Sequence, residues 1–193
     1  MTLRARFSQA LASIRGFLPE GDSLSLLRSK GGRRMVTGVF AAYALVVIGL
    51  GVYWSWPPPA FDVAENRADY LQSSQSLVTG SATTSALLEV TRLLLEKKGG
   101  YISNDVVPPG AFLDNMPSWE YGALIQSRDL ARALREVLSR SQSQSQEDVD
   151  LTLAEPRINF QNASWVLPST ESQYRDARRY LEAYLNRLPK QGE

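Results

Sequence analysis

A run of 22 residues without a charge, residues 35–56, constrains this chain more than any other feature. As an α-helix the run is about 33 Å long, which matches a bilayer hydrocarbon core of roughly 30 Å. Tyr53, Trp54 and Trp56 lie at one end, where aromatic rings prefer the lipid headgroups, and three prolines follow at once. The run exceeds the roughly 7–15 apolar residues of a cleaved signal peptide. We therefore predict a transmembrane helix over residues 35–56 that remains as an anchor, and not a buried core helix.

The charges on the two sides of this run predict its orientation. Residues 1–34 carry a net charge of +5, whereas residues 62–69 carry three acids and one arginine. Basic flanks stay on the cytoplasmic side of a membrane. We expect residues 1–34 in the cytoplasm and residues 57–193 outside it, which is the periplasm in a bacterium with two membranes. The formal net charge of the whole chain is +1, and this argues against a nucleic-acid-binding protein.

The segment before the anchor allows two interpretations. Within residues 1–18 the apolar side chains recur at helical spacing, at Leu3, Phe7, Leu11, Ile14 and Leu18. Such a basic amphipathic helix can lie on an anionic lipid leaflet. The alternative is a tail whose apolar residues contact a partner subunit. Residues 21–32 are rich in Gly and Ser and are typical of a flexible linker.

Beyond the anchor the sequence predicts a mostly α protein, a small helical bundle with long irregular loops. The expected helices cover residues 61–78, 83–98, 118–140 and 169–188, with start signals at Thr83 or Thr84, Ser118, and Ser169 or Thr170. The last helix has the clearest apolar stripe, formed by Tyr174, Ala177, Leu181, Tyr184 and Leu188. Three prolines make residues 101–118 an ordered loop. We expect residues 139–150 to be a polar linker and residues 151–168 to be irregular, with a short strand over 157–160.

Several unusual strings resemble the bacterial family known as domain of unknown function 2333 (DUF2333). They are GGYISNDVVPPG (99–110), FLDNMPSWEYG (112–122), RDLARAL (128–134), SRSQSQS (139–145) and, later, SWVLPSTESQY (164–174). The resemblance covers residues 80–188. It implies a Gram-negative inner-membrane protein with one N-terminal span and a mostly helical periplasmic domain, and it implies no reaction. Longer members are expected to continue with further helical sequence, so this chain is expected to be a short or truncated member.

The residue types available limit the chemistry. The chain contains no Cys and no His, so no disulfide, thiol nucleophile, imidazole base or Cys/His metal cluster can form. The acids Asp105, Asp114, Glu120 and Asp129 lie within 25 residues of one another, close to Asn104 and Asn115. Three interpretations are open: an acid–base pair that cleaves cell-wall sugars, a hard-cation site, or ordinary turn and helix-start residues. We favour the last, and we predict no catalytic, cofactor-binding or metal-ligating residue.

A different group of residues is suited to contacts with partners. Arg128, Arg132 and Arg135 share a helix face, either as an anion-binding patch or as a solvated face paired with Asp129 and Glu136. Trp119 and Tyr121 are expected to pack on the bundle or to enter a partner's pocket. Gly38 and Ala42 form a small-xxx-small pair that can seat a neighbouring helix. The Ser-Gln repeat is either a linker or a contact surface, and its candidate residues are Ser141, Gln142, Ser143 and Gln144.

The sequence therefore predicts a non-enzymatic, single-span membrane protein. Its domain outside the cytoplasm is expected to bind or scaffold another component, as an accessory subunit or a homo-oligomer, without a cofactor. The alternative is a membrane-tethered hydrolase of the cell envelope that uses Asp105, Asp114 or Glu120. A third hypothesis is a lipid-facing module that binds anionic headgroups through the helix of Arg128.

Overall fold

The computed structural model describes residues 29–71, 78–138 and 147–191, and within these ranges it is helical and contains no strand. The mostly α prediction is therefore confirmed. The contacts between residues divide the chain into two units, of which the first ends at Ile48 and the second starts at Gly49. The helices are α3 (Lys30–Trp54), α4 (Val63–Tyr70), α5 (Ser81–Glu96), α6 (Asn115–Ala133), α7 (Val149–Ile158) and α8 (Thr170–Gln191), with a 3₁₀ turn η1 (Gly110–Phe112) and a π turn η2 (Leu134–Leu138).

Helix α3 is the apolar run, and it is long and apolar enough to cross a membrane. Its 25 residues span about 37 Å, and none of them is buried. The helix begins at Lys30, five residues before the apolar run, because the Ser29 hydroxyl accepts a hydrogen bond from the Gly32 amide at 2.9 Å. It ends at Trp54, shortly before the three prolines.

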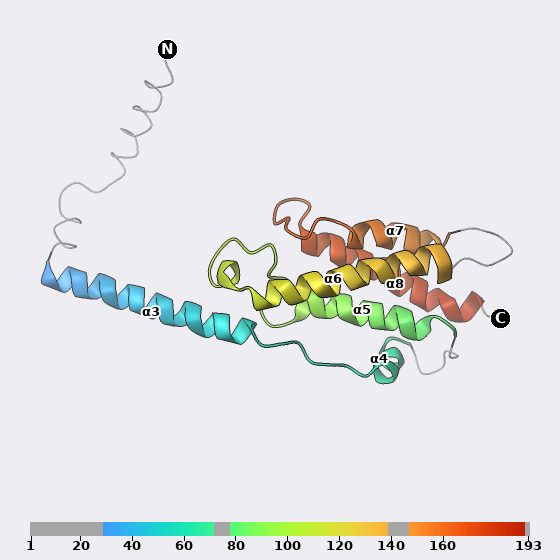
Figure 1. Ribbon diagram of the computed structural model, residues 1–193, viewed down its shortest axis with the longest axis horizontal. Coiled ribbons are helices and arrows are strands. Elements are labelled where there is room, and N and C mark those ends of the chain that lie inside the picture. Colours follow the sequence, from blue (N-terminus) through green and yellow to red (C-terminus); the bar gives the residue numbers. More distant parts are fainter. Residues whose placement is uncertain (1–28, 72–77, 139–146, 192–193) are drawn as a thin grey trace, which may run out of the picture. The chain divides into compact units, whose positions relative to one another are not determined.

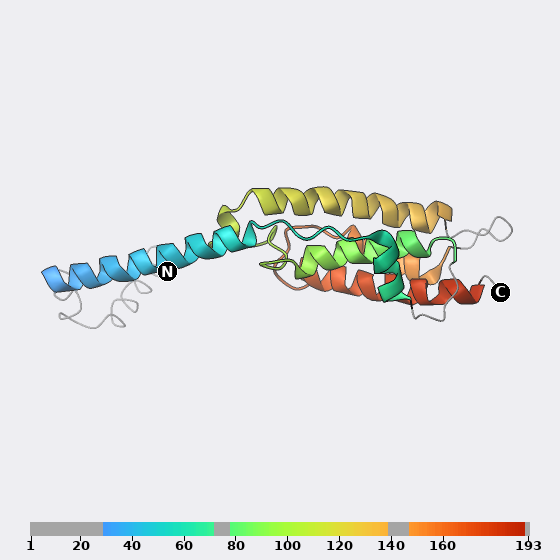
Figure 2. The same ribbon diagram turned by 90° about the horizontal axis from the view of Figure 1, so that it is seen from below.

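In the unit that starts at Gly49, helices α5, α6, α7 and α8 run side by side, and the two views in Figures 1 and 2 agree on this arrangement. The short helix α4 packs on α5. The predicted stripe of α8 faces the core, since all five of its residues are buried. The start of α8 is also confirmed, because the Ser169 hydroxyl accepts from the Ser172 amide at 3.3 Å. The largest fully buried apolar side chains of the core are Leu87, Leu88, Leu94, Ile102, Leu124, Leu134, Leu151, Ile158, Leu181 and Leu185.

The irregular segment and short strand expected over residues 151–168 are wrong in their first half, where the chain forms α7. Asp148 starts this helix by accepting from the amides of Asp150 at 2.9 Å and Leu151 at 3.3 Å. Pro156 lies inside the helix and removes one backbone hydrogen bond. The helix persists because Leu151, Ala154 and Ile158 are buried in the core, so packing outweighs the local penalty.

The other predicted helix limits need smaller corrections. Helix α4 ends at Tyr70, and its buried residue is Asn66, whose side-chain amide donates to the Ser85 carbonyl at 3.0 Å. Helix α5 starts after Gly80 at φ +93, a conformation that favours glycine, and its start has no side-chain cap. Helix α6 starts at Asn115 and not at Ser118, since Pro117 is tolerated within a first turn.

Candidate functional site

The most deeply buried charged groups of the bundle are Lys97 and Glu120, which form an ion pair. Glu120 projects from α6, and Lys97 follows the last residue of α5. The Glu120 side chain is 0 % exposed, and the Lys97 side chain is 1 % exposed. The Lys97 ammonium donates to a Glu120 oxygen and to the Gly100 carbonyl. A buried charge is tolerated only when it is paired and hydrogen-bonded, and this pair satisfies both conditions.

Glu120 also holds the loop that follows α5. Its carboxylate accepts from the backbone amides of Ile102 at 2.8 Å and Ser103 at 2.7 Å, and from the Ser103 hydroxyl. With Lys97, four donor groups converge on one carboxylate. Glu120 is therefore a structural anchor of the loop, since its oxygens are occupied by this chain's own donors. The sequence prediction that it acts only as a helix-start charge is wrong, because the side chain turns inward to the loop.

A second loop, residues 159–169, is fixed beside the first one. The Tyr101 hydroxyl donates to the Asn162 carbonyl, and the Asn104 amide donates to the Ser164 carbonyl, both at 3.0 Å. The Tyr101 ring meets the Tyr174 ring edge-on at 5.7 Å, and burial raises the pKa of the Tyr101 hydroxyl. Figure 1 shows both loops at the same end of the bundle. The two loops therefore present one combined surface.

The outer side of this surface is apolar. Leu167 is 96 % exposed, Phe112 is 77 % exposed and Trp165 is 64 % exposed. We name the exposed apolar residues of the two loops the loop patch, which consists of Val106, Val107, Phe112, Trp165, Val166 and Leu167. Contiguous exposed apolar surface on a folded domain marks a contact with a protein or a membrane. The sequence prediction had no signal for this patch, because its two parts are separated by about 50 residues.

The last turn of α3 and the residues after it belong to the same unit as these loops. A Cβ placed on Gly99, whose φ is +84°, would lie 2.7 Å from the Trp54 ring, so only glycine fits here. The Asn115 amide donates to the Ser55 carbonyl at 3.2 Å. The Lys98 ammonium lies 5.1 Å from the Tyr53 ring centre and 4.8 Å from that of Trp56. The chain that leaves α3 is thus packed on the loop end of the bundle.

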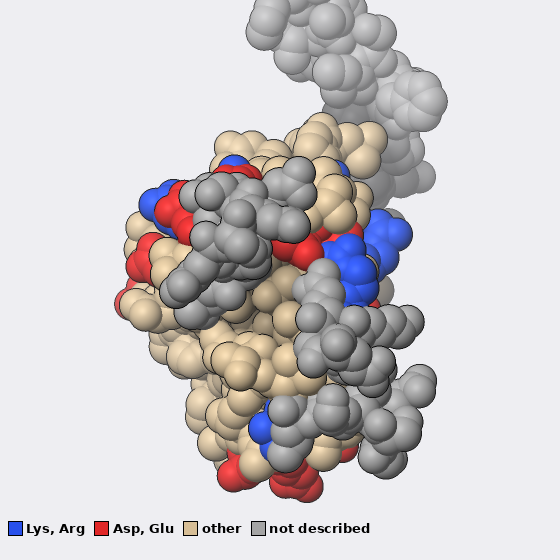
Figure 3. All heavy atoms as spheres, turned by 90° about the vertical axis from the view of Figure 1, so that its right-hand side faces the viewer, with Lys and Arg blue, Asp and Glu red and all other residues tan. Residues whose placement is uncertain are grey.

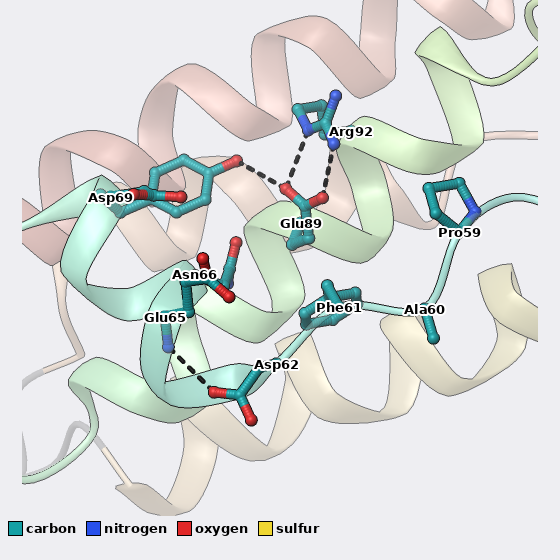
Figure 4. Close-up of a pocket in the computed structure, with 10 residues that line it drawn as sticks. Pro59, Ala60, Phe61, Asp62, Glu65, Asn66, Asp69, Glu89 and Arg92 are labelled. Atoms are coloured by element: carbon teal, nitrogen blue, oxygen red, sulfur yellow. Dashed lines mark hydrogen bonds and ion pairs between the residues drawn. The ribbon is translucent and has the colours of Figure 1, made fainter.

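A cavity of about 460 Å³ lies between α4, the segment before it and α5 (Figure 4). Its acidic side chains are Asp62, Glu65, Asp69 and Glu89. Asp62 is already used, because it caps α4 through the amides of Ala64 and Glu65. Glu89 is held by Arg92 at 2.5 Å and 2.8 Å, and this hydrogen-bonded guanidinium lowers the pKa of the Glu89 carboxyl.

The family model described as an uncharacterized protein conserved in bacteria (DUF2333) matches residues 27–193. The chain belongs to the DUF2333 family. The matched residues include α3 as well as the bundle. No curated protein and no solved structure matches this DUF2333 chain.

The four acids singled out from the DUF2333 sequence have different environments. Glu120 is buried, Asp105 is half-buried, and Asp114 and Asp129 are exposed. Burial is the main cause that raises the pKa of the Asp105 carboxyl, and the negative charges of Glu120 and Glu171 raise it further. Within the described ranges, no group of three acids is placed to hold a metal ion. The envelope-hydrolase hypothesis gains no support from these positions and stays a prediction.

Arg128 and Arg132 lie on α6, and Arg135 lies on η2. Within the described ranges Arg132 forms no ion pair with Asp129 or Glu136, so those two expected pairs are wrong. Arg128 donates to the carbonyls of Ile158 at 3.0 Å and Phe160 at 2.7 Å, at the end of α7. Arg135 bonds both Glu147 and Glu155, and Arg132 lies 3.9 Å from Glu155. These side chains bridge α6 and η2 to α7 and the residues beside it, because these elements are neighbours in the bundle.

The remaining partner candidates are placed as follows. Trp119 is half-buried, whereas Tyr121 is exposed, so the expected packing of Tyr121 on the bundle is wrong. Gly38 and Ala42 are exposed on α3, and a Cβ on Gly38 would meet nothing within 4 Å. Ser141, Gln142, Ser143 and Gln144 lie outside the described residues, as do residues 1–18 with their possible contact to anionic lipid.

Proposed function

We propose that this DUF2333 protein is a single-span protein of the bacterial inner membrane, with residues 1–34 in the cytoplasm and the helical bundle in the periplasm. The observation that carries the proposal is the exposure of α3, which is apolar over about 30 Å and has no buried residue. The bundle after it has a core of its own, so α3 is not needed to complete that core. The excess of basic residues before the span supports the orientation.

Within the membrane the protein acts as a binding, scaffolding or accessory subunit of a larger assembly and does no chemistry of its own. Its buried ion pair is used to fix a loop, and the arginines of α6 and η2 are used to fix α7. The open small-residue face of α3 at Gly38 and Ala42 supports a helix partner in the membrane. That partner is a second copy of this chain or another single-span protein.

The size of the complex tests this function. The full chain is extracted in a mild detergent, and its mass is measured by light scattering during size-exclusion chromatography. We expect a stoichiometric complex, which the double substitution Gly38→Ile and Ala42→Ile weakens by keeping the helices apart. Ala44→Ile is the matched control, because Ala44 lies on nearly the opposite face of α3. A strictly monomeric protein without a stoichiometric partner contradicts the proposal.

A further inference from the structure

We propose that the loop patch of the bundle lies in the membrane interface, among the headgroups and upper acyl chains of the leaflet in which α3 ends. The patch consists of the exposed apolar residues of two loops, as defined above. This inference rests on the proposed anchoring by α3 and goes beyond it, because it assigns a second lipid contact to the folded domain itself. The occupant of the patch is therefore a lipid surface.

The depth of the first loop follows from its contacts with the end of α3. A Cβ on Gly51 would lie 3.6 Å from the Pro109 side chain and 3.9 Å from the Leu113 side chain. Gly51 precedes the last residue of α3, Trp54, by three positions, which is about 4.5 Å along the helix axis. Residues 109–113 are thus level with the last turn of the span. If α3 crosses the bilayer, this loop is at the level of the headgroups.

The second loop is held at the same level by direct hydrogen bonds. Asn162 and Ser164 accept from Tyr101 and Asn104 of the first loop. The Thr170 hydroxyl closes the second loop, because it donates to the Gln161 carbonyl at 2.9 Å and accepts from the Ser164 amide at 3.0 Å. The second loop therefore presents its tip, with the fully exposed Leu167, beside the first.

The side chains around the patch are those that membrane interfaces select. Trp56 is exposed, and the Lys98 ammonium lies over the rings of Tyr53 and Trp56. Amphipathic aromatic rings are enriched at the headgroup level, and lysine there extends its ammonium toward water and phosphate. Trp165 in the second loop adds a further ring of this kind. A soluble partner would not require this combination next to the end of a span.

The opposite end of the bundle provides the contrast. Figure 3 shows that end, and both acidic and basic side chains lie on it. There the first turn of α7 meets the last turns of α8, where Arg187 pairs with Asp148 and Asp150, each at 2.7 Å. The bundle thus has ion pairs at one end, where Val137 and Val149 are also exposed, and the loop patch at the other, which is the end in contact with the last turn of α3. Such a polarity is expected of a domain that rests on a membrane.

The patch is also held in place before any lipid arrives. Glu120 fixes the backbone of Ile102 and Ser103, directly before the first exposed residues of the patch. A loop that is ordered in advance loses less conformational entropy when it inserts. The anchor at Glu120 therefore has a functional consequence, because it presents Val106, Val107 and Phe112 outward.

Fluorescent labels at single cysteines test the inference, and the absence of native Cys makes such labelling specific. Full-length Phe112→Cys and Leu167→Cys proteins are labelled with an environment-sensitive fluorophore and reconstituted into phosphatidylcholine vesicles with brominated acyl chains. Val137→Cys is the matched control, since Val137 is an exposed apolar residue of the π turn after α6. Val46→Cys reports on the span itself. Val166→Cys replaces Leu167→Cys if the latter does not fold by circular dichroism.

We expect labels at 112 and 167 to shift to shorter emission wavelengths and to lose much of their intensity to the brominated lipid. The label at 137 should have the same emission intensity and wavelength in brominated vesicles as in unbrominated vesicles. Unquenched labels at 112 and 167, together with a quenched label at 46, overturn the inference and leave the anchoring intact. A label at 46 that is not quenched overturns the anchoring as well. A shift at 112 and 167 without quenching indicates coverage by protein and also overturns the inference.

Discussion

Removing one partner of the buried ion pair should destabilise the bundle strongly. In Glu120→Gln the Lys97 ammonium stays buried but loses its carboxylate partner, and its acceptors are then two neutral oxygens, the Gly100 carbonyl and the new side-chain amide. Breaking a buried pair in this way costs about 3–5 kcal/mol. At about 2–4 °C per kcal/mol for a chain of this size, the melting temperature should fall by roughly 6–20 °C.

Removing the other partner of the pair, Lys97, should cost less stability. In Lys97→Met the Glu120 carboxylate keeps three donors, the amides of Ile102 and Ser103 and the Ser103 hydroxyl. Since hydrogen bonds to a charged group each contribute about 1.5–3 kcal/mol, most of the stabilisation of the loop remains, and we expect a loss of about 1–3 kcal/mol. The double variant should be more stable than the sum of the two single losses implies, because neither charge is then left unpaired.

The assay is thermal unfolding of the full chain in nonionic detergent, followed by circular dichroism. Asp129→Asn is the matched control, because Asp129 is an exposed acid on the same helix and its loss should cost less than about 0.5 kcal/mol. A Glu120→Gln protein that melts together with the control would show that the buried ion pair does not stabilise the bundle. So would strictly additive effects in the double variant, since they would mean that the two groups do not interact.

Three further predictions concern the loops and the helix ends. Arg128→Met should destabilise the bundle by about 1–3 kcal/mol in the same melting assay, because the carbonyls of Ile158 and Phe160 lose their donor; Arg132→Met, at a longer ion pair, should cost less. Gly99→Ala should expose the Trp54 ring, seen as a red shift in fluorescence of a variant with Trp54 as its single tryptophan, because a Cβ overlaps the ring at φ +84°. Asp105→Asn should be more stable than the parent at neutral pH. Burial raises the pKa of Asp105 in the folded state, so the parent loses stability as the pH rises from about 3.9 through that raised pKa, and the difference should vanish below about pH 3.9. Equal stability of both proteins at every pH would contradict this.

Regular apolar patterns were sufficient to predict the long elements. The uncharged run predicted α3, and the stripe from Tyr174 to Leu188 predicted α8 together with the face that it buries. Each of these two signals lies within a single helix and depends only on the spacing of residues along the chain. Helix α7 carries no such clear signal, because Pro156 and the polar segment before Asp148 both suggest an irregular chain. Its helical state is decided by packing between helices, which spacing within a single segment does not show.

The candidate site could be predicted less well than the helices, because it is formed by contacts between residues that are far apart in the sequence. The helix expected over residues 83–98 places Lys97 in its last turn, where a cation complements the helix dipole. The residue instead has an extended backbone with φ −60° and ψ 169°, so the chain leaves the helix there and the side chain reaches Glu120, 23 residues later. The loop patch joins residues near 110 with residues near 166 through the bonds of Tyr101 and Asn104. Neither pairing can be read from local sequence.

The proposed function depends on one arrangement, in which α3 crosses the membrane with the bundle on the outer side. Its most direct test is cysteine accessibility in intact cells, with single cysteines placed at Ser25, Val46 and Val137 and a membrane-impermeant maleimide as the probe. We expect labelling at 137 in intact cells with a permeabilised outer membrane, labelling at 25 only after the inner membrane is broken, and no labelling at 46 until the protein is denatured. Labelling at 25 but not at 137 in intact cells would contradict the orientation, and free labelling at 46 would contradict the span.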